Sequence, residues 1–73
     1  MDNKLRKELI RKRLIEEMEA SKMPRSKMAK ELACTGSLLS QYKYGNKLPS
    51  IVMLAKICEV IGADANYILG ISE

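Results

Sequence analysis

The residues of this chain that are best suited to chemistry lie between positions 34 and 46, where small or uncharged polar side chains follow one another. A solvent-facing helix would normally carry Lys and Glu, which form helices better than Ser or Gly. With an advance of about 100° per residue, five of these positions fall within an arc of roughly 140°. The polar face consists of Gly36, Ser37, Ser40, Gln41 and Tyr44, and the opposite face of Leu38, Leu39 and Tyr42.

Short and hydrogen-bonding side chains on one helix face can approach the base edges of DNA, because the major groove is wide enough for one helix. Gln41 is the strongest candidate, since a glutamine amide can bond adenine bidentately, whereas a serine hydroxyl donates or accepts. Gly36 has no side chain to read with, and Tyr44 suits either a sugar-phosphate contact or a packing role. The five residues therefore predict a base-reading face. A merely solvated face is the alternative.

The basic residues are concentrated in one part of the chain. The 73 residues carry 13 Lys and Arg against 9 Asp and Glu, a formal net charge of +4. Residues 22–47 hold six basic residues against Glu31 alone, a local net charge of +5. Such localised charge indicates a polyanionic partner, most simply nucleic acid, with a solubilising surface as the alternative. The residues expected to bind phosphate are Arg25, Thr35, Lys43, Asn46 and Lys47.

Several function classes are excluded by what the sequence lacks. It has no histidine, and no metal-ligand spacing surrounds Cys34 or Cys58, so zinc binding and His-based catalysis are not expected. No nucleophile and base stand in a recognisable arrangement. We therefore expect neither an enzyme nor a cofactor or small-molecule ligand. No apolar run approaches the roughly 18 residues of a membrane span, so we expect a cytoplasmic protein with reduced thiols, a disulfide being the alternative.

The spacing of apolar residues predicts five helices and no strand. Residues 4–20 repeat apolar side chains about every four positions between Arg, Lys and Glu, which is typical of an amphipathic helix. A second helix is expected over residues 24–33 and a third over residues 36–44. Thr35 should cap the third helix at its N-terminus, and Gly45 should end it in a left-handed conformation.

Two more helices are expected in the C-terminal third of the chain. Ser50 should cap a fourth helix, whose buried apolar face begins with Ile51 and which Gly62 closes. Asp64 should cap a last short helix that ends before Gly70. No linker, repeat or low-complexity segment interrupts this arrangement, so the chain is expected to form a single domain.

A series of motifs continues without gaps from Met23 to Gly70. Ala29 stands at the centre of the second predicted helix, and Gly45-Asn46-Lys47-Leu48-Pro49-Ser50 separates the third helix from the apolar fourth one. In these motifs the chain resembles the Cro and phage-repressor type of helix-turn-helix DNA-binding domain, the XRE family. The resemblance implies a compact five-helix, lambda-repressor-like fold for residues 1–73, with the helix-turn-helix at about residues 24–45.

The resemblance also implies how DNA would be read. In this family the residues that match Gly36, Ser37 and Gln41 are the usual base readers. The chain departs from the family pattern inside the helix-turn-helix, with Arg25 where Gln is usual and Ala33 where Gly is usual.

These patterns together predict a sequence-specific transcriptional regulator of double-stranded DNA, a repressor of phage or mobile-element type. One such domain reads only about four to six base pairs, so we expect a homodimer that binds an inverted repeat. Its interface would use either the C-terminal helix with Tyr67 and Ile71 or the apolar side of the N-terminal helix. The alternative is a protein-interaction module, or an antitoxin, that keeps the fold without specific DNA binding.

Overall fold

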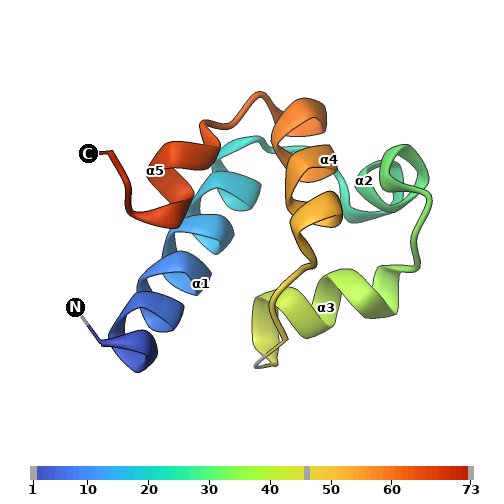
Figure 1. Ribbon diagram of the computed structural model, residues 1–73. Coiled ribbons are helices and arrows are strands. Elements are labelled where there is room, and N and C mark those ends of the chain that lie inside the picture. The colour runs from blue at the N-terminus through green and yellow to red at the C-terminus, as the bar shows by residue number, and fades with distance from the viewer. Residues whose placement is uncertain (1, 46, 73) are drawn as a thin grey trace.

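The computed structural model describes residues 2–45 and 47–72, and within them the chain folds into five α-helices and no strand, as the apolar spacing predicts. The helices are α1 (Asn3–Ala20), α2 (Arg25–Leu32), α3 (Gly36–Tyr44), α4 (Ile51–Ile61) and α5 (Ala65–Leu69). α1 packs against α5 and α3, and α4 packs against α2 and α5. In Figure 1, α3 runs along the outer edge of the molecule, on the side away from α5.

Side chains at the N-cap positions determine where four of the helices begin. Asp2, Thr35, Ser50 and Asp64 each accept a hydrogen bond from a backbone N–H in the first turn that follows. These bonds satisfy donors that have no partner inside the helix. The caps predicted at Thr35, Ser50 and Asp64 are confirmed, and α3 has its predicted bounds.

The second helix is one residue shorter at each end than the predicted range 24–33. Pro24 has an extended backbone (φ −58°, ψ 145°) and makes no side-chain cap, so it precedes the helix. Ala33 lies in the left-handed region with φ 54°, where a residue with a Cβ is disfavoured by about 1 to 2 kcal/mol. This left-handed residue ends α2 and turns the chain toward α3.

Glycines follow three of the helices, but not for the same reason. Gly62 and Gly70 end α4 and α5 at the predicted positions, and both adopt the left-handed conformation, with φ of 69° and 77°. The left-handed conformation predicted for Gly45 is wrong, because this residue is extended (φ −95°, ψ −167°). A Cβ at position 45 would lie 2.9 Å from the carbonyl oxygen of Gln41. Glycine fits there because the chain passes so close to the last turn of α3.

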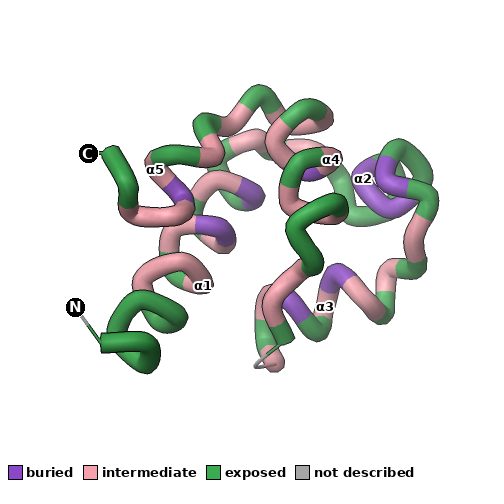
Figure 2. Tube along the Cα trace, viewed as in Figure 1, coloured by how far each residue is buried: buried purple, intermediate pink, exposed green. Residues whose placement is uncertain are grey.

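Mostly aliphatic side chains from all five helices form one core. Its buried residues are Leu14, Met18, Met28, Ala29, Leu32, Leu39, Tyr42, Ile57 and Ile68. No buried polar or charged residue interrupts this core within the described part of the chain. Figure 2 shows that the N-terminal part of α1 lies outside the core, and Leu5 is 54% exposed.

The first turn of α4 differs from the prediction. Ile51, expected on the buried face, is 88% exposed, and the neighbouring Val52 is 70% exposed. Ile57, further along the same helix, is fully buried. The amphipathic pattern is therefore correct for the middle of α4 and wrong for its first turn, where two β-branched side chains face solvent.

Candidate nucleic-acid interface

The nine residues of α3 separate into a buried side and an outward side. Leu39 and Tyr42 lie in the core. The residues predicted to read bases lie on the other side: Ser37, Gln41 and Tyr44 are exposed, and Gly36 and Ser40 are half-buried. The structure therefore brings all five together on one surface, which we call the polar face of α3.

The two tyrosines of α3 have different environments. Tyr44 is 70% exposed, so it is not a packing ring of the core. Tyr42 is the core ring, and burial raises the pKa of its hydroxyl above the ordinary 10.0, with Cys34 nearby raising it further. The packing alternative considered for Tyr44 from the sequence is therefore wrong, and its ring is available on the polar face.

The turn between α2 and α3 is closed by bonds from both sides. The backbone N–H of Cys34 donates to the carbonyl of Ala29 at 2.9 Å, across the left-handed Ala33. Lys56 of α4 reaches the same helix end, and its Nζ donates to the Leu32 carbonyl at 3.1 Å. A cation at the C-terminus of a helix also interacts favourably with the helix dipole. These contacts fix the direction in which the chain leaves α2 and enters α3.

Arg25, the first residue of α2, lies across the polar face of α3. Its NH1 group donates a hydrogen bond of 2.7 Å to the Ser40 hydroxyl. Its Cδ is 3.5 Å from the position that a Cβ on Gly36 would occupy. Residues predicted for two separate roles, phosphate binding at Arg25 and base reading at Ser40, are therefore in direct contact.

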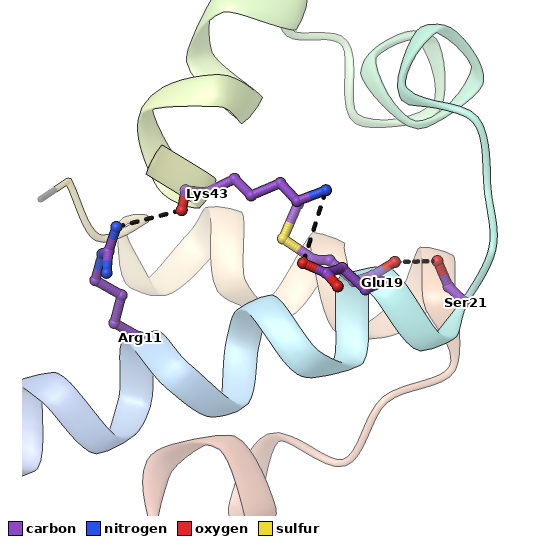
Figure 3. Close-up of polar contacts among 5 residues, drawn as sticks. Arg11, Glu19, Ser21 and Lys43 are labelled. Atoms are coloured by element: carbon purple, nitrogen blue, oxygen red, sulfur yellow. Dashed lines mark hydrogen bonds and ion pairs between the residues drawn. The ribbon is translucent and has the colours of Figure 1, made fainter. Parts of the chain in front are cut away.

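Arg11 of α1 holds the C-terminal end of α3, as Figure 3 shows for the Lys43 carbonyl. Its Nε–H donates to the Gly45 carbonyl at 2.8 Å, and its NH2 group donates to the Lys43 carbonyl at 3.2 Å. The sequence analysis missed Arg11, because nothing in the spacing of the basic residues of α1 distinguishes it from its neighbours.

Lys43, predicted to bind phosphate, turns toward α1. Its Nζ lies 3.8 Å from a carboxylate oxygen of Glu19 (Figure 3) and 5.6 Å from the centre of the Tyr44 ring. The side chains of Lys43 and Glu19 are 37% and 56% exposed. An ion pair this exposed contributes little to stability, so the ammonium group can change partners at small cost.

The remaining phosphate-binding candidates lie at the two ends of α3. Thr35 is exposed at the N-terminal end, where its hydroxyl oxygen accepts a 3.1 Å bond from the Leu38 N–H. Since a threonine hydroxyl also carries a donor, it can still donate to a phosphate oxygen. Lys47 is exposed in the loop before α4. Asn46 lies outside the described residues.

A small hollow lies beside the polar face. It has a volume of about 110 Å³, and its lining includes Met18, Met23, Met28, Arg25, Ser40 and Tyr44. Methionine side chains adapt their shape to irregular gaps. The hollow therefore places methionine side chains beside Arg25 and Ser40.

The two cysteines are free, half-buried thiols, so the disulfide alternative is wrong. Burial raises the pKa of the Cys58 thiol, and the carboxylates of Asp64 and Glu17 raise it further. A thiol in this state is a weak nucleophile.

Over the described residues no group of three or more His, Cys, Asp or Glu side chains is placed to hold a metal ion. None of the described helices combines the length and apolarity of a membrane span.

Comparisons of the chain with protein-family models, with curated proteins and with solved structures find no match. The functional features of the chain therefore lie in α2, the turn and α3. α3 presents one polar face outward, Arg25 lies across that face, and exposed groups stand at both ends of α3.

Proposed function

We propose that this protein is a transcriptional regulator that binds double-stranded DNA in a sequence-specific manner through α3. The observation that carries the proposal is the polar face of α3, which faces outward while Leu39 and Tyr42 of the same helix are buried. A helix presented in this way fits the major groove. Short uncharged side chains can reach base edges there, whereas a face of long charged chains would favour the backbone of any sequence.

Charge around the polar face supports the same proposal. Lys47 is exposed, and Lys43 has only a weak, exposed ion pair with Glu19 to exchange for a phosphate. The N-terminus of α2 has no side-chain cap, so its first amides are available to a phosphate oxygen. The chain as a whole carries a net charge of +4. These groups would supply affinity that does not depend on sequence.

The sequence also supports the proposal, because it resembles the Cro and phage-repressor type of helix-turn-helix domain. A regulator of this kind gains specificity as a homodimer, with two recognition helices about one helical turn apart on an inverted repeat. Bound over a promoter in the cytoplasm, it would exclude polymerase and act as a repressor. Both cysteines are free, which agrees with a reducing compartment.

One observation favours the second candidate, a protein-interaction module or antitoxin. Ile51 and Val52 form an exposed apolar pair at the start of α4, 88% and 70% exposed. Exposed apolar groups of this size are common on ordinary surfaces, and only a larger contiguous patch indicates an interface. We therefore favour DNA binding.

The test is selection of bound duplexes from a random DNA pool by the purified protein at near-physiological salt, followed by sequencing. Enrichment of an inverted repeat is the expected result, and its half-site spacing would report the separation of the two α3 helices. Binding without enrichment, which disappears as salt rises, would show general electrostatics only. In that case the interaction module becomes the better proposal.

A further inference from the structure

One hydrogen bond places the side chain of Arg25 across the polar face of α3. Its NH1 group donates to the Ser40 hydroxyl at 2.7 Å, which fixes the guanidinium group over the middle of α3. Its Cδ lies 3.5 Å from the Cβ position at Gly36, so the arginine side chain crosses the space that a larger residue at position 36 would fill. The missing side chain at Gly36 is therefore replaced, on the polar face, by the side chain of Arg25.

The guanidinium group keeps most of its hydrogen-bonding capacity. An arginine has five N–H donors in a planar fork, and Arg25 uses one of them for Ser40. Within residues 2–45 and 47–72 the single ion pair joins Lys43 to Glu19, so no carboxylate engages Arg25 there. Arg25 is exposed, and methionine side chains line the hollow beside it. The donors that remain on the fork can bond a planar acceptor pair in front of α3.

We infer that Arg25 reads a guanine in the major groove and that Ser40 is the positioning residue that orients it. The O6 and N7 atoms of guanine form the acceptor pair that an arginine fork bonds bidentately. This inference rests on the proposed function and deepens it by naming the sequence class, a half-site with one guanine opposite the middle of α3. It replaces the phosphate-binding role that the sequence predicts for Arg25.

The test compares wild-type protein with five variants on the duplex that the wild-type protein selects. Arg25→Ala removes the guanidinium fork, and Ser40→Ala removes the hydroxyl that orients it. Lysine is not used at position 25, because its ammonium group also bonds guanine. Gly36→Leu leaves Arg25 in the chain but occupies the space that its side chain crosses, whereas Gly36→Ala adds only an ordinary contact at 3.5 Å. Lys27→Ala is the matched control, because Lys27 is an exposed cation of the same helix. Circular dichroism establishes that each variant is folded.

The expected result is a guanine that is selected by the wild-type protein, is lost from the preference of Arg25→Ala and Gly36→Leu, and is selected less strongly by Ser40→Ala. Exchange of that base for adenine should weaken wild-type binding about 5- to 150-fold. A duplex with 7-deazaguanine, which lacks the N7 acceptor, should weaken wild-type binding but leave Arg25→Ala binding unchanged. Gly36→Ala and Lys27→Ala should keep the guanine preference.

Four results would overturn the inference, and they differ in what they say of the proposed function. If Arg25→Ala keeps the guanine preference and weakens all duplexes equally, Arg25 contacts phosphate only and the proposed function stands. If Ser40→Ala keeps the guanine preference in full, Ser40 does not position Arg25 and the proposed function again stands. If the selected motif contains no guanine that depends on Arg25, the inference is again wrong while sequence-specific binding remains. If the wild-type protein enriches no sequence, the proposed function fails and the inference fails with it.

Discussion

Arg11 of α1 donates its Nε–H to the carbonyl oxygen of Gly45 at 2.8 Å, across 34 positions of the sequence. The second bond of Arg11, to the Lys43 carbonyl, lies beside the first at the C-terminal end of α3. Both acceptors stand at the negative end of the helix dipole, which strengthens their interaction with a cation. The orientation of the polar face therefore depends on a residue outside the segment that carries it.

Arg11→Ala should lower the free energy of unfolding by about 1 to 3 kcal/mol, because two half-buried carbonyls lose a charged donor. A urea titration followed by circular dichroism measures the change. Lys12→Ala is the matched control: it removes a neighbouring cation that is exposed, and it should change stability by no more than about 0.5 kcal/mol. Equal losses in the two variants would contradict the role assigned to the Arg11 bonds.

Ala33→Gly should raise the free energy of unfolding by about 1 kcal/mol, because glycine adopts a positive φ without the cost that a Cβ brings. Ala33 is exposed, with φ 54°, so the substitution removes no buried contact. Thermal unfolding gives the measurement. Ala55→Gly, an exposed site inside α4, should lower stability by about 1 kcal/mol. A loss at both sites would show that the left-handed geometry at Ala33 costs nothing.

Gln41→Ala and Lys47→Ala separate base reading from phosphate binding. Gln41→Ala should relax the preference at one base pair, by about 1 to 3 kcal/mol, with little change in the salt dependence. Lys47→Ala should weaken binding to all sequences alike and reduce the slope of affinity against salt by about 1. Titrations of selected and random duplexes at several salt concentrations measure both effects. If the two variants lose affinity equally on both kinds of duplex, the assignment of Gln41 to base reading and of Lys47 to phosphate binding is wrong.

Stability should fall at alkaline pH, because burial raises the pKa of Tyr42 in the folded state above the ordinary value of 10.0. The folded state then keeps the phenol proton to a higher pH than the unfolded state does. This contribution is fully present below pH 10.0 and is lost as pH rises through the raised pKa of the folded state. The Cys58 thiol acts in the same direction from its ordinary value of 9.0.

Unfolding by urea at a series of pH values, from neutral to strongly alkaline, measures this loss. Tyr42→Phe keeps the ring and removes the titrating hydroxyl, so its stability should decline less steeply above pH 10.0 than that of the wild-type protein. An identical decline in the two proteins would show that Tyr42 ionises alike in the folded and unfolded chains.

Local chemistry explains why much of the fold could be predicted from the sequence. Thr35, Ser50 and Asp64 cap helices through bonds to backbone groups two or three residues away, so residue type and spacing suffice. The polar face of α3 follows from helical periodicity in the same way. Leu39 and Tyr42 are buried where an advance of about 100° per residue puts them on the side away from the middle of the polar face.

Contacts between distant segments could not be predicted in this way. The bond from Arg25 to Ser40 depends on how α2 and α3 cross, and the bonds from Arg11 depend on where α1 meets the end of α3. The apolar pattern of α4 predicts Ile51 on the buried face, but this pattern does not say how far neighbouring helices extend along α4. Gly45 shows the same limit. Glycine is favoured both by a left-handed turn and by a close approach of the backbone to a helix, so the sequence does not distinguish the two.

The helix ends of the α2–α3 segment are closed by other parts of the chain. Lys56 of α4 bonds the Leu32 carbonyl, and Arg11 of α1 bonds the Gly45 carbonyl. The segment is therefore not an autonomous folding unit, and its polar face forms in the same cooperative transition as the core. For a domain of 73 residues, whose margin of stability is small, the fraction of molecules that present the polar face equals the folded fraction. Destabilising substitutions far from α3 thus reduce the population that presents this face, without removing any contact of α3 itself.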